Sequence, residues 1–130
     1  MERKKVKVLV IDDSALMRKF LTDSLSQSRD IEVVGSALDA AIAARKINSL
    51  SPDVITLDVE MPGIDGLTFL QKLMVANPIP AIMVSALTTK GTSAAVRALE
   101  LGAFDVIGKP DFSKTDSAPE FVRDLTEKII

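Results

Sequence analysis

Short apolar runs rich in β-branched residues alternate with longer, more polar segments along the whole chain. Five such runs are expected to be strands, because they are short and nearly all apolar. The expected strands are residues 6–11, 31–35, 54–57, 81–84 and 105–107. Each is followed by a segment long enough for a helix, so the pattern predicts an alternation of strands and helices.

Apolar residues at helical spacing predict helices after the first, third and fifth strands. In the first of these, Ser14 stands where an N-cap would accept a backbone N–H. The positions that carry the three predictions are Met17, Phe20, Leu21 and Leu25; Phe69, Leu70, Leu73 and Met74; and Phe121, Leu125 and Ile129. The second and fourth helices, over 39–48 and 91–101, are predicted from alanine-rich segments with a less one-sided pattern.

Apolar strands separated by helices belong in a parallel sheet that is covered on both faces. The sequence therefore predicts one α/β domain over residues 1–130, a doubly wound five-stranded parallel sheet with five helices. In such sheets the reactive edge lies beyond the carboxyl ends of the strands. The polar, turn-rich segment 111–119 is expected to be a loose loop.

The composition narrows the chemistry that this domain could perform. The 130 residues contain no histidine and no cysteine, which excludes a Ser-His-Asp triad, a phosphohistidine and a zinc site built on those residues. A net charge of −2 gives no basic footprint for direct nucleic-acid binding. No apolar run approaches the roughly 20 residues of a membrane helix, and the basic start is not a secretory signal, so a cytoplasmic protein is expected.

Chemically useful side chains stand where four of the expected strands end. They are Asp12 and Asp13, Asp58, Ser85 and Thr88, and Lys109 before Pro110. Crowded carboxylates repel one another unless a cation neutralises them, so the pattern predicts a magnesium site. Asp58 could then act as a nucleophile toward a phosphoryl group, with Lys109 and Ser85 contacting its oxygens.

Each of these residues alone has an ordinary explanation. An Asp at a strand end is more often a helix cap, a Lys-Pro pair is usually a turn, and a Ser after a strand is usually a cap. Solvated surface charge has no reason to gather acids, a hydroxyl and a lysine at one edge of a sheet. The combination therefore favours a functional site.

Four segments of the chain resemble the signature segments of response-regulator receiver domains. They are VLVIDDSALMRK, PDVITLDVEMPGIDGL, IMVSALT and GAFDVIGKP. The resemblance implies a flavodoxin-like strand order 2-1-3-4-5 and phosphorylation of Asp58 by a histidine kinase. It also implies that Asp12, Asp13 and the Glu60 backbone carbonyl bind magnesium together with Asp58. Ser85 and Lys109 would then contact the phosphate.

The same resemblance carries three finer expectations. The Lys109–Pro110 bond would be cis, and Gly66 would serve the tight turn that opens the third helix. The family often has Tyr or Phe where this chain has Val106, and the nearest aromatic residue is Phe104. Output is therefore expected through Ser85 and the loop 86–90, toward the surface of the fourth helix, fifth strand and fifth helix.

Within this family, the sequences of these segments are most similar to the receiver of chemotaxis protein-glutamate methylesterases. Those enzymes carry a Ser-His-Asp triad in a second domain, and this chain has neither histidine nor a G-x-S-x-G motif. An effector domain is accordingly expected beyond residue 130, while the chain itself is expected to be a phosphorylated switch. Glu60 either tunes access of water to the phosphoryl group or is simply solvated.

Three other classes of protein share part of this pattern. An aspartate-nucleophile phosphatase would need D-x-D after the first strand, where this chain has Asp12-Asp13-Ser14. A flavin or nucleotide module shares the strand order, but no glycine-rich loop, Trp or Tyr supports it. A degenerate receiver that only binds partners would be expected to have lost one of the five key residues, and all five are present; a stand-alone receiver that keeps its phosphorylation site and acts by protein contact stays open as the alternative to a tethered effector.

Overall fold

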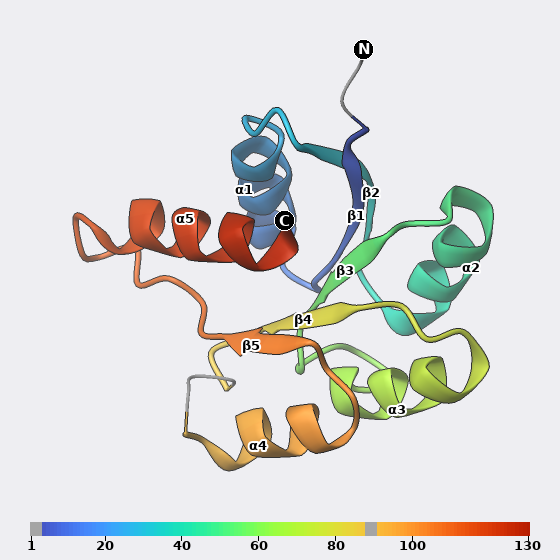
Figure 1. The fold of residues 1–130 in the computed structure, drawn as a ribbon. Helices are drawn as coiled ribbons and strands as arrows, with labels where there is room; N and C mark the ends of the chain where they lie inside the picture. The colour runs from blue at the N-terminus through green and yellow to red at the C-terminus, as the bar shows by residue number, and fades with distance from the viewer. Residues whose placement is uncertain (1–3, 88–90) are drawn as a thin grey trace.

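The computed structural model describes residues 4–87 and 91–130, which form a five-stranded sheet with helices on both faces (Figure 1). All strands are parallel and lie in the order β2-β1-β3-β4-β5, as predicted. The strands are β1 (Val6–Ile11), β2 (Ile31–Ala37), β3 (Val54–Leu57), β4 (Ala81–Val84) and β5 (Asp105–Ile107). The helices are α1 (Ala15–Leu25), α2 (Ala40–Leu50), α3 (Gly66–Ala76), α4 (Ser93–Glu100) and α5 (Ser117–Ile129).

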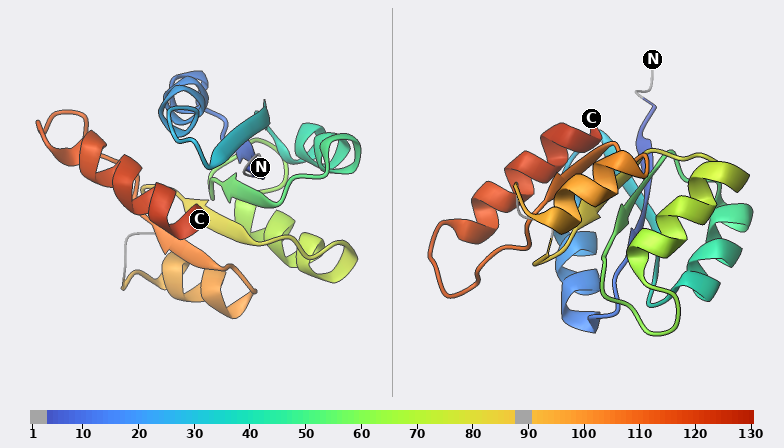
Figure 2. Two further views of the ribbon diagram at one scale, coloured as in Figure 1. Left: turned by 45° about the horizontal axis from the view of Figure 1, so that its top comes forward. Right: turned by 90° about the horizontal axis from the view of Figure 1, so that it is seen from below.

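The sheet separates two apolar cores. Helices α1 and α5 cover one face, and α2, α3 and α4 cover the other (Figure 2). Alternate residues of β1 serve the two sides: Val8 and Val10 pack with α1 and α5, whereas Leu9 and Ile11 pack with α2 and α3. This two-sided burial explains why the strands are continuously apolar rather than alternating. No helix in the described part of the chain is long and apolar enough to cross a bilayer.

Four helices begin at a polar side chain that accepts a backbone N–H three residues ahead. The prediction for Ser14 is confirmed, since its hydroxyl accepts the Met17 N–H. Asp39, Asp65 and Thr92 play the same part for α2, α3 and α4. Each satisfies one of the backbone donors that a helix start leaves without an intrahelical partner.

The bounds of four elements differ from the prediction. One of them, α2, spans Ala40–Leu50 instead of 39–48. β2 runs two residues further than expected, to Ala37, after a register shift opposite Val8 and Leu9. α4 begins at Ser93, because Thr92 caps it. α5 begins inside the expected loose loop, at Ser117, and places Pro119 in its first turn, where a missing N–H removes no intrahelical hydrogen bond.

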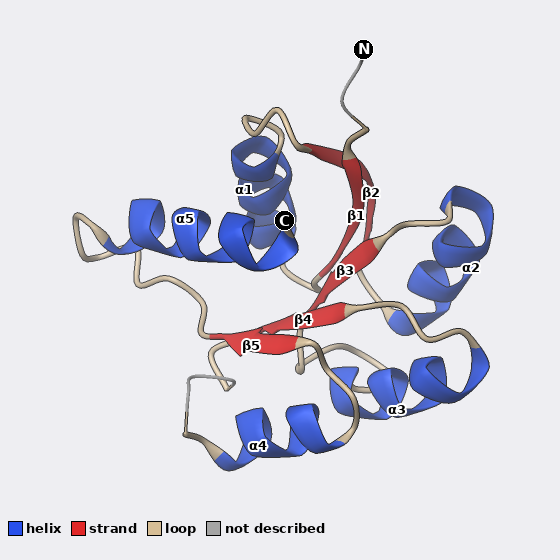
Figure 3. Ribbon diagram, viewed as in Figure 1, coloured by secondary structure: helices blue, strands red, loops and turns tan. Residues whose placement is uncertain are grey.

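The loop from β3 to α3 turns in a different place from the one predicted (Figure 3). Its left-handed residue is Gly63, with φ of 79°. Gly66 is needed for another reason: a Cβ at this position would lie 1.9 Å from the carbonyl oxygen of Asp58. The missing side chain of Gly66 therefore lets α3 start directly against the backbone of Asp58, and the expected turn role belongs to Gly63.

Candidate functional site

Acidic side chains from the ends of β1 and β3 meet at the carboxyl edge of the sheet. Ile11 pairs with Leu57, and the Asp58 N–H donates to the Ile11 carbonyl at 3.0 Å. Asp12 and Asp58 therefore follow paired strand ends, and both are buried, with exposed fractions of 1% and 2%. Together with Asp13 they offer carboxylate oxygens that all lie within 4.8 Å of one another.

Lys109 bridges the two buried acids. Its Nζ lies 3.1 Å from Asp12 Oδ2 and 3.2 Å from Asp58 Oδ2. Burial lowers the pKa of Lys109, but the hydrogen bonds and charges of the two carboxylates outweigh it, so this pKa is raised. The ammonium is therefore held in its charged form between the ends of β1 and β3.

The environment of Asp12 disfavours its charged form despite the ion pair with Lys109. Burial is the largest cause and raises its pKa to about 6, with the charge of Asp58 adding to the rise. The Ser14 backbone N–H, 2.9 Å from Oδ1, and the contact with Lys109 lower this pKa but do not cancel the burial. One ammonium does not compensate three gathered carboxylates.

The remaining acids of the prediction lie at the rim. Asp13 is exposed and contributes a carboxylate to the cluster, while Glu60 is exposed and its backbone N–H lies 3.4 Å from Asp58 Oδ1. The donor set thus consists of carboxylate oxygens with an excess of negative charge and one side open to solvent. Such a set fits a hard divalent cation such as Mg²⁺, which takes oxygen ligands and keeps positions for other oxygens.

Ser85 directly follows β4, at the same edge of the sheet as the acidic cluster. Its side chain is buried, its carbonyl accepts the Lys109 N–H at 3.3 Å, and its Oγ accepts the Leu87 N–H at 3.2 Å. The backbone contact brings the ends of β4 and β5 together, as the sequence predicted. Thr88 and the end of the expected signalling loop 86–90 lie outside the described residues.

The expected cis bond between Lys109 and Pro110 is wrong for this structure, in which no described peptide bond is cis. The two isomers of an X-Pro bond differ by only about 0.5–1 kcal/mol, so a Lys-Pro pair does not dictate the cis form. Lys109 contacts both carboxylates with the bond trans.

The sequence of this chain matches a known protein family over most of its length. Residues 8–117 match the model of the response regulator receiver domain. This chain belongs to that family. The cluster of Asp12, Asp13 and Asp58 is the acidic triad typical of the magnesium site of receiver domains.

Full-length relatives of this receiver domain are larger proteins. It is 50% identical over 129 residues to a protein-glutamate methylesterase/protein-glutamine glutaminase of Geobacter metallireducens, covering 99% of this chain and 36% of that protein. It is 55% identical over 125 residues to one from Syntrophus aciditrophicus, covering 96% of this chain and 36% of that protein. The chain thus spans about a third of the length of these relatives.

Solved structures agree with this assignment. The response regulator domain of Thermotoga maritima CheB is 42% identical and superposes with a TM-score of 0.89 over 97% of this chain and 94% of that one. A chain of the CheX-CheY-BeF3-Mg²⁺ complex from Borrelia burgdorferi is 26% identical, with a TM-score of 0.78 over 98% of this chain and 91% of that one. The receiver domain is therefore similar to the N-terminal receivers of CheB methylesterases.

Val106 stands three residues before Lys109. At this position the receiver family often has an aromatic residue. Val106 is half-buried and packs against the core under α2, α3 and α4. Phe104 is 63% exposed, two positions before Val106 in the chain, so its ring does not occupy the half-buried place of Val106. An ordinary packing role therefore accounts for Val106.

Sequence reasoning missed one residue that contacts this site. Arg18 Nη1 donates to the backbone carbonyl of Asp12 at 2.8 Å, from the first turns of α1. An arginine on a helix gives no sign in the sequence of which carbonyl it will reach.

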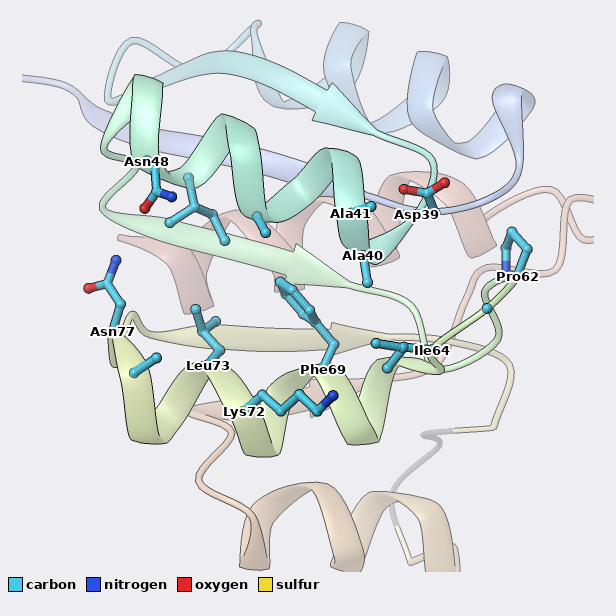
Figure 4. A pocket seen from close by; sticks show the side chains of 14 residues that line it. Asp39, Ala40, Ala41, Asn48, Pro62, Ile64, Phe69, Lys72, Leu73 and Asn77 are labelled. Atoms are coloured by element: carbon cyan, nitrogen blue, oxygen red, sulfur yellow. The ribbon is translucent and has the colours of Figure 1, made fainter.

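A second concave region of this receiver domain has a different character. A cavity of about 560 Å³ lies between α2 and α3, and Ile47 is among its lining residues. The apolar side chains of Phe69 and Leu73 point into it (Figure 4). Small residues of α2, among them Ala40 and Ala44, leave this space open. It is lined by none of the acids of the triad.

Proposed function

We propose that this domain is a phosphorylation switch in which Asp58 takes a phosphoryl group from a histidine kinase with the help of Mg²⁺. The observation that supports it best is the environment of Asp58. A carboxylate buried to 2% exposure is placed against two further acids and a lysine. Structural stability gives no reason to gather three acids around one ammonium, whereas phosphoryl transfer requires such a site.

The transfer moves one phosphoryl group between two side chains. An Asp58 carboxylate oxygen attacks phosphorus, the P–N bond to the donor imidazole breaks, and that nitrogen keeps the electron pair. The 130 residues of this domain contain no histidine, so the phosphohistidine of the proposed donor lies outside this domain. The product is an acyl phosphate on Asp58.

The metal site of this proposal consists of Asp12, Asp13, Asp58 and the backbone carbonyl of Glu60. When bound, Mg²⁺ would neutralise the charge that gathers on the phosphoryl oxygens. Asp12 and Asp58 provide the buried oxygens, and Asp13 provides the exposed one.

Lys109 and Ser85 complete the proposed site on the side of β4 and β5. Lys109 already contacts Asp58 and can follow the added negative charge with its ammonium. Ser85 directly follows the neighbouring strand β4, and a serine hydroxyl can donate as well as accept a hydrogen bond. We expect both to contact phosphoryl oxygens, which would pull the ends of β4 and β5 toward Asp58.

The proposed output is a methylesterase effector domain in the same polypeptide, beyond residue 130. The similarity to CheB receivers supports this partner. The surface of α4, β5 and α5 supports a contact there, because Val96, Leu99 and Phe104 are about half exposed or more. A cytoplasmic location goes with this proposal.

Labelling with acetyl phosphate and Mg²⁺ tests the phosphorylation site. The wild-type protein should gain one phosphoryl group by mass spectrometry, and Asp58→Asn should gain none. Asp23→Asn is a matched control, because Asp23 is an exposed acid that only pairs with Lys19 on α1. Labelling of Asp58→Asn at the wild-type level would overturn the assignment.

A stand-alone receiver that acts by protein contact is the second candidate, because the described domain has its own complete cores. The reading frame beyond Ile130 distinguishes the two. A G-x-S-x-G motif with a histidine further along supports the tethered effector, and a stop codon directly after this domain supports the stand-alone receiver.

A further inference from the structure

The loop from β1 to α1 fixes its two acids in different ways. The Asp12 side chain is held by the Ser14 N–H on Oδ1 and by Lys109 on Oδ2. Asp13 is exposed, and within residues 4–87 and 91–130 no hydrogen bond or ion pair holds its carboxylate. Its position in the acidic cluster therefore depends on the backbone that leads into it.

Arg18 acts on that backbone. The carbonyl that it contacts at 2.8 Å belongs to the peptide unit joining Asp12 to Asp13. Because a peptide unit is planar, the direction of the carbonyl also sets the position of the Asp13 Cα. The Asp12 N–H is tied to the Ala37 carbonyl at 3.0 Å, so the strand side of the loop is fixed as well.

We infer that Arg18 is a positioning residue of the metal site, which holds the Asp12–Asp13 peptide so that the Asp13 carboxylate faces Asp58. The inference rests on the proposed function, since it concerns the same magnesium site. It assigns Arg18 no contact with the metal or with the phosphoryl group. The guanidinium is suited to the task because it is half-buried and its planar fork fixes the direction of its N–H donors.

Arg18 could affect the metal site through its charge or by positioning Asp13, and the two roles predict opposite changes in magnesium affinity when Arg18 is removed. A cation close to a magnesium site repels Mg²⁺, so removing it should strengthen metal binding if charge alone matters. If Arg18 acts by orienting Asp13, removing it should weaken metal binding. The sign of the change therefore separates the two roles.

Magnesium titration of Arg18→Met, followed by amide chemical shifts, tests the inference. We expect affinity to fall roughly tenfold, as for other residues that orient a metal ligand without touching the metal. Arg18→Lys should recover part of this loss, because it keeps a donor on a shorter, less directional side chain. Lys19→Met is the matched control: it removes an equal charge from the next position of α1, where Lys19 is exposed and pairs with Asp23.

A metal-free measurement keeps the inference separate from the proposed function. Without Mg²⁺, the Asp13 amide should exchange and relax faster in Arg18→Met than in the wild type, and Lys19→Met should leave it unchanged. If the wild type bound no magnesium, the proposed function would fail, and the Asp13 amide would still decide the positioning role. Unchanged or tighter magnesium binding in Arg18→Met, an equal loss in Lys19→Met, or an Asp13 amide as ordered as in the wild type overturns the inference.

Discussion

The two ends of the parallel sheet both carry charged side chains, but they hold them differently. At the amino end, Lys128 pairs with Asp105 at 3.0 Å, and both side chains keep about a third of their surface exposed. At the carboxyl end, Asp12 and Asp58 are buried and share Lys109. Water solvates the first pair, whereas the second arrangement leaves excess negative charge in a poorly solvated place.

This difference separates charges that the fold tolerates from charges that a function requires. An exposed pair changes stability little, in either direction. A buried cluster of like charges lowers stability unless something else binds to it. The carboxyl end is therefore the part of the molecule whose sequence is explained by a ligand rather than by the fold.

Removing the lysine at each end gives the largest expected contrast. In metal-free protein at pH 7, Lys109→Met should lower the free energy of unfolding by about 3 kcal/mol, because two buried carboxylates lose a shared cation. Lys128→Met should lower it by less than about 1 kcal/mol. Urea unfolding of both variants in the presence of a chelator measures the difference, and similar losses at the two ends would contradict the comparison.

Neutralising Asp12 should raise the free energy of unfolding, whereas removing Lys109 should lower it. Its pKa in the folded protein is about 6, against an ordinary value of 3.8, so the folded state binds this proton more tightly than the unfolded state. The contribution of Asp12 is therefore most favourable below about pH 4, and it is lost as the pH rises through about 6. Asp12→Asn carries no such charge and should be more stable than the wild type at pH 7 by up to about 3 kcal/mol, less whatever the lost ion pair with Lys109 contributes.

Unfolding in a chelator between pH 4.5 and 7.5 measures this effect. The wild type should lose stability across that range relative to Asp12→Asn. The same substitution at the amino end, Asp105→Asn, should gain nothing, because Asp105 is partly exposed and paired with Lys128. An Asp12→Asn protein that is less stable than the wild type at pH 7 would show that the cluster is not under electrostatic stress.

Magnesium should produce the smallest of the three effects, and only at the carboxyl end. At a concentration tenfold above its Kd, a ligand of the folded state stabilises it by about 1.4 kcal/mol. Asp13→Ala should abolish this gain and leave the metal-free stability nearly unchanged, because the exposed Asp13 carboxylate makes no hydrogen bond or ion pair with the residues that the structure describes. Thermal unfolding with and without Mg²⁺ tests this, with Asp23→Ala as the control. Undiminished magnesium stabilisation in Asp13→Ala would exclude Asp13 as a ligand.

The sequence by itself determined the elements and the edge at which the acids meet, whereas the order of the strands in the sheet came from the resemblance to receiver domains. Four of the five strands have the predicted bounds, because a short apolar run between turn-forming residues is a local property. Asp12 and Asp58 could be placed together because parallel strands end at a common edge. The Ser14 cap was predictable because it involves only the next three residues.

Contacts between distant segments were decided only by the tertiary structure. The Arg18 contact with the Asp12 carbonyl and the closeness of Gly66 to the Asp58 carbonyl leave no pattern in the sequence. The trans bond before Pro110 belongs here too, since the two isomers differ too little for the local sequence to choose between them.

The start of α5 at Ser117 also depends on contacts that the local sequence does not reveal. The segment 111–119 is polar and turn-rich, but the Ser117 hydroxyl accepts the Asp111 N–H, and Phe112 packs edge-on against Phe20 of α1 at 5.1 Å. These contacts order a segment whose own composition favours a loop. Periodicity and strand ends are encoded residue by residue, whereas a hydrogen bond or a ring contact depends on where the folded sheet brings its partners.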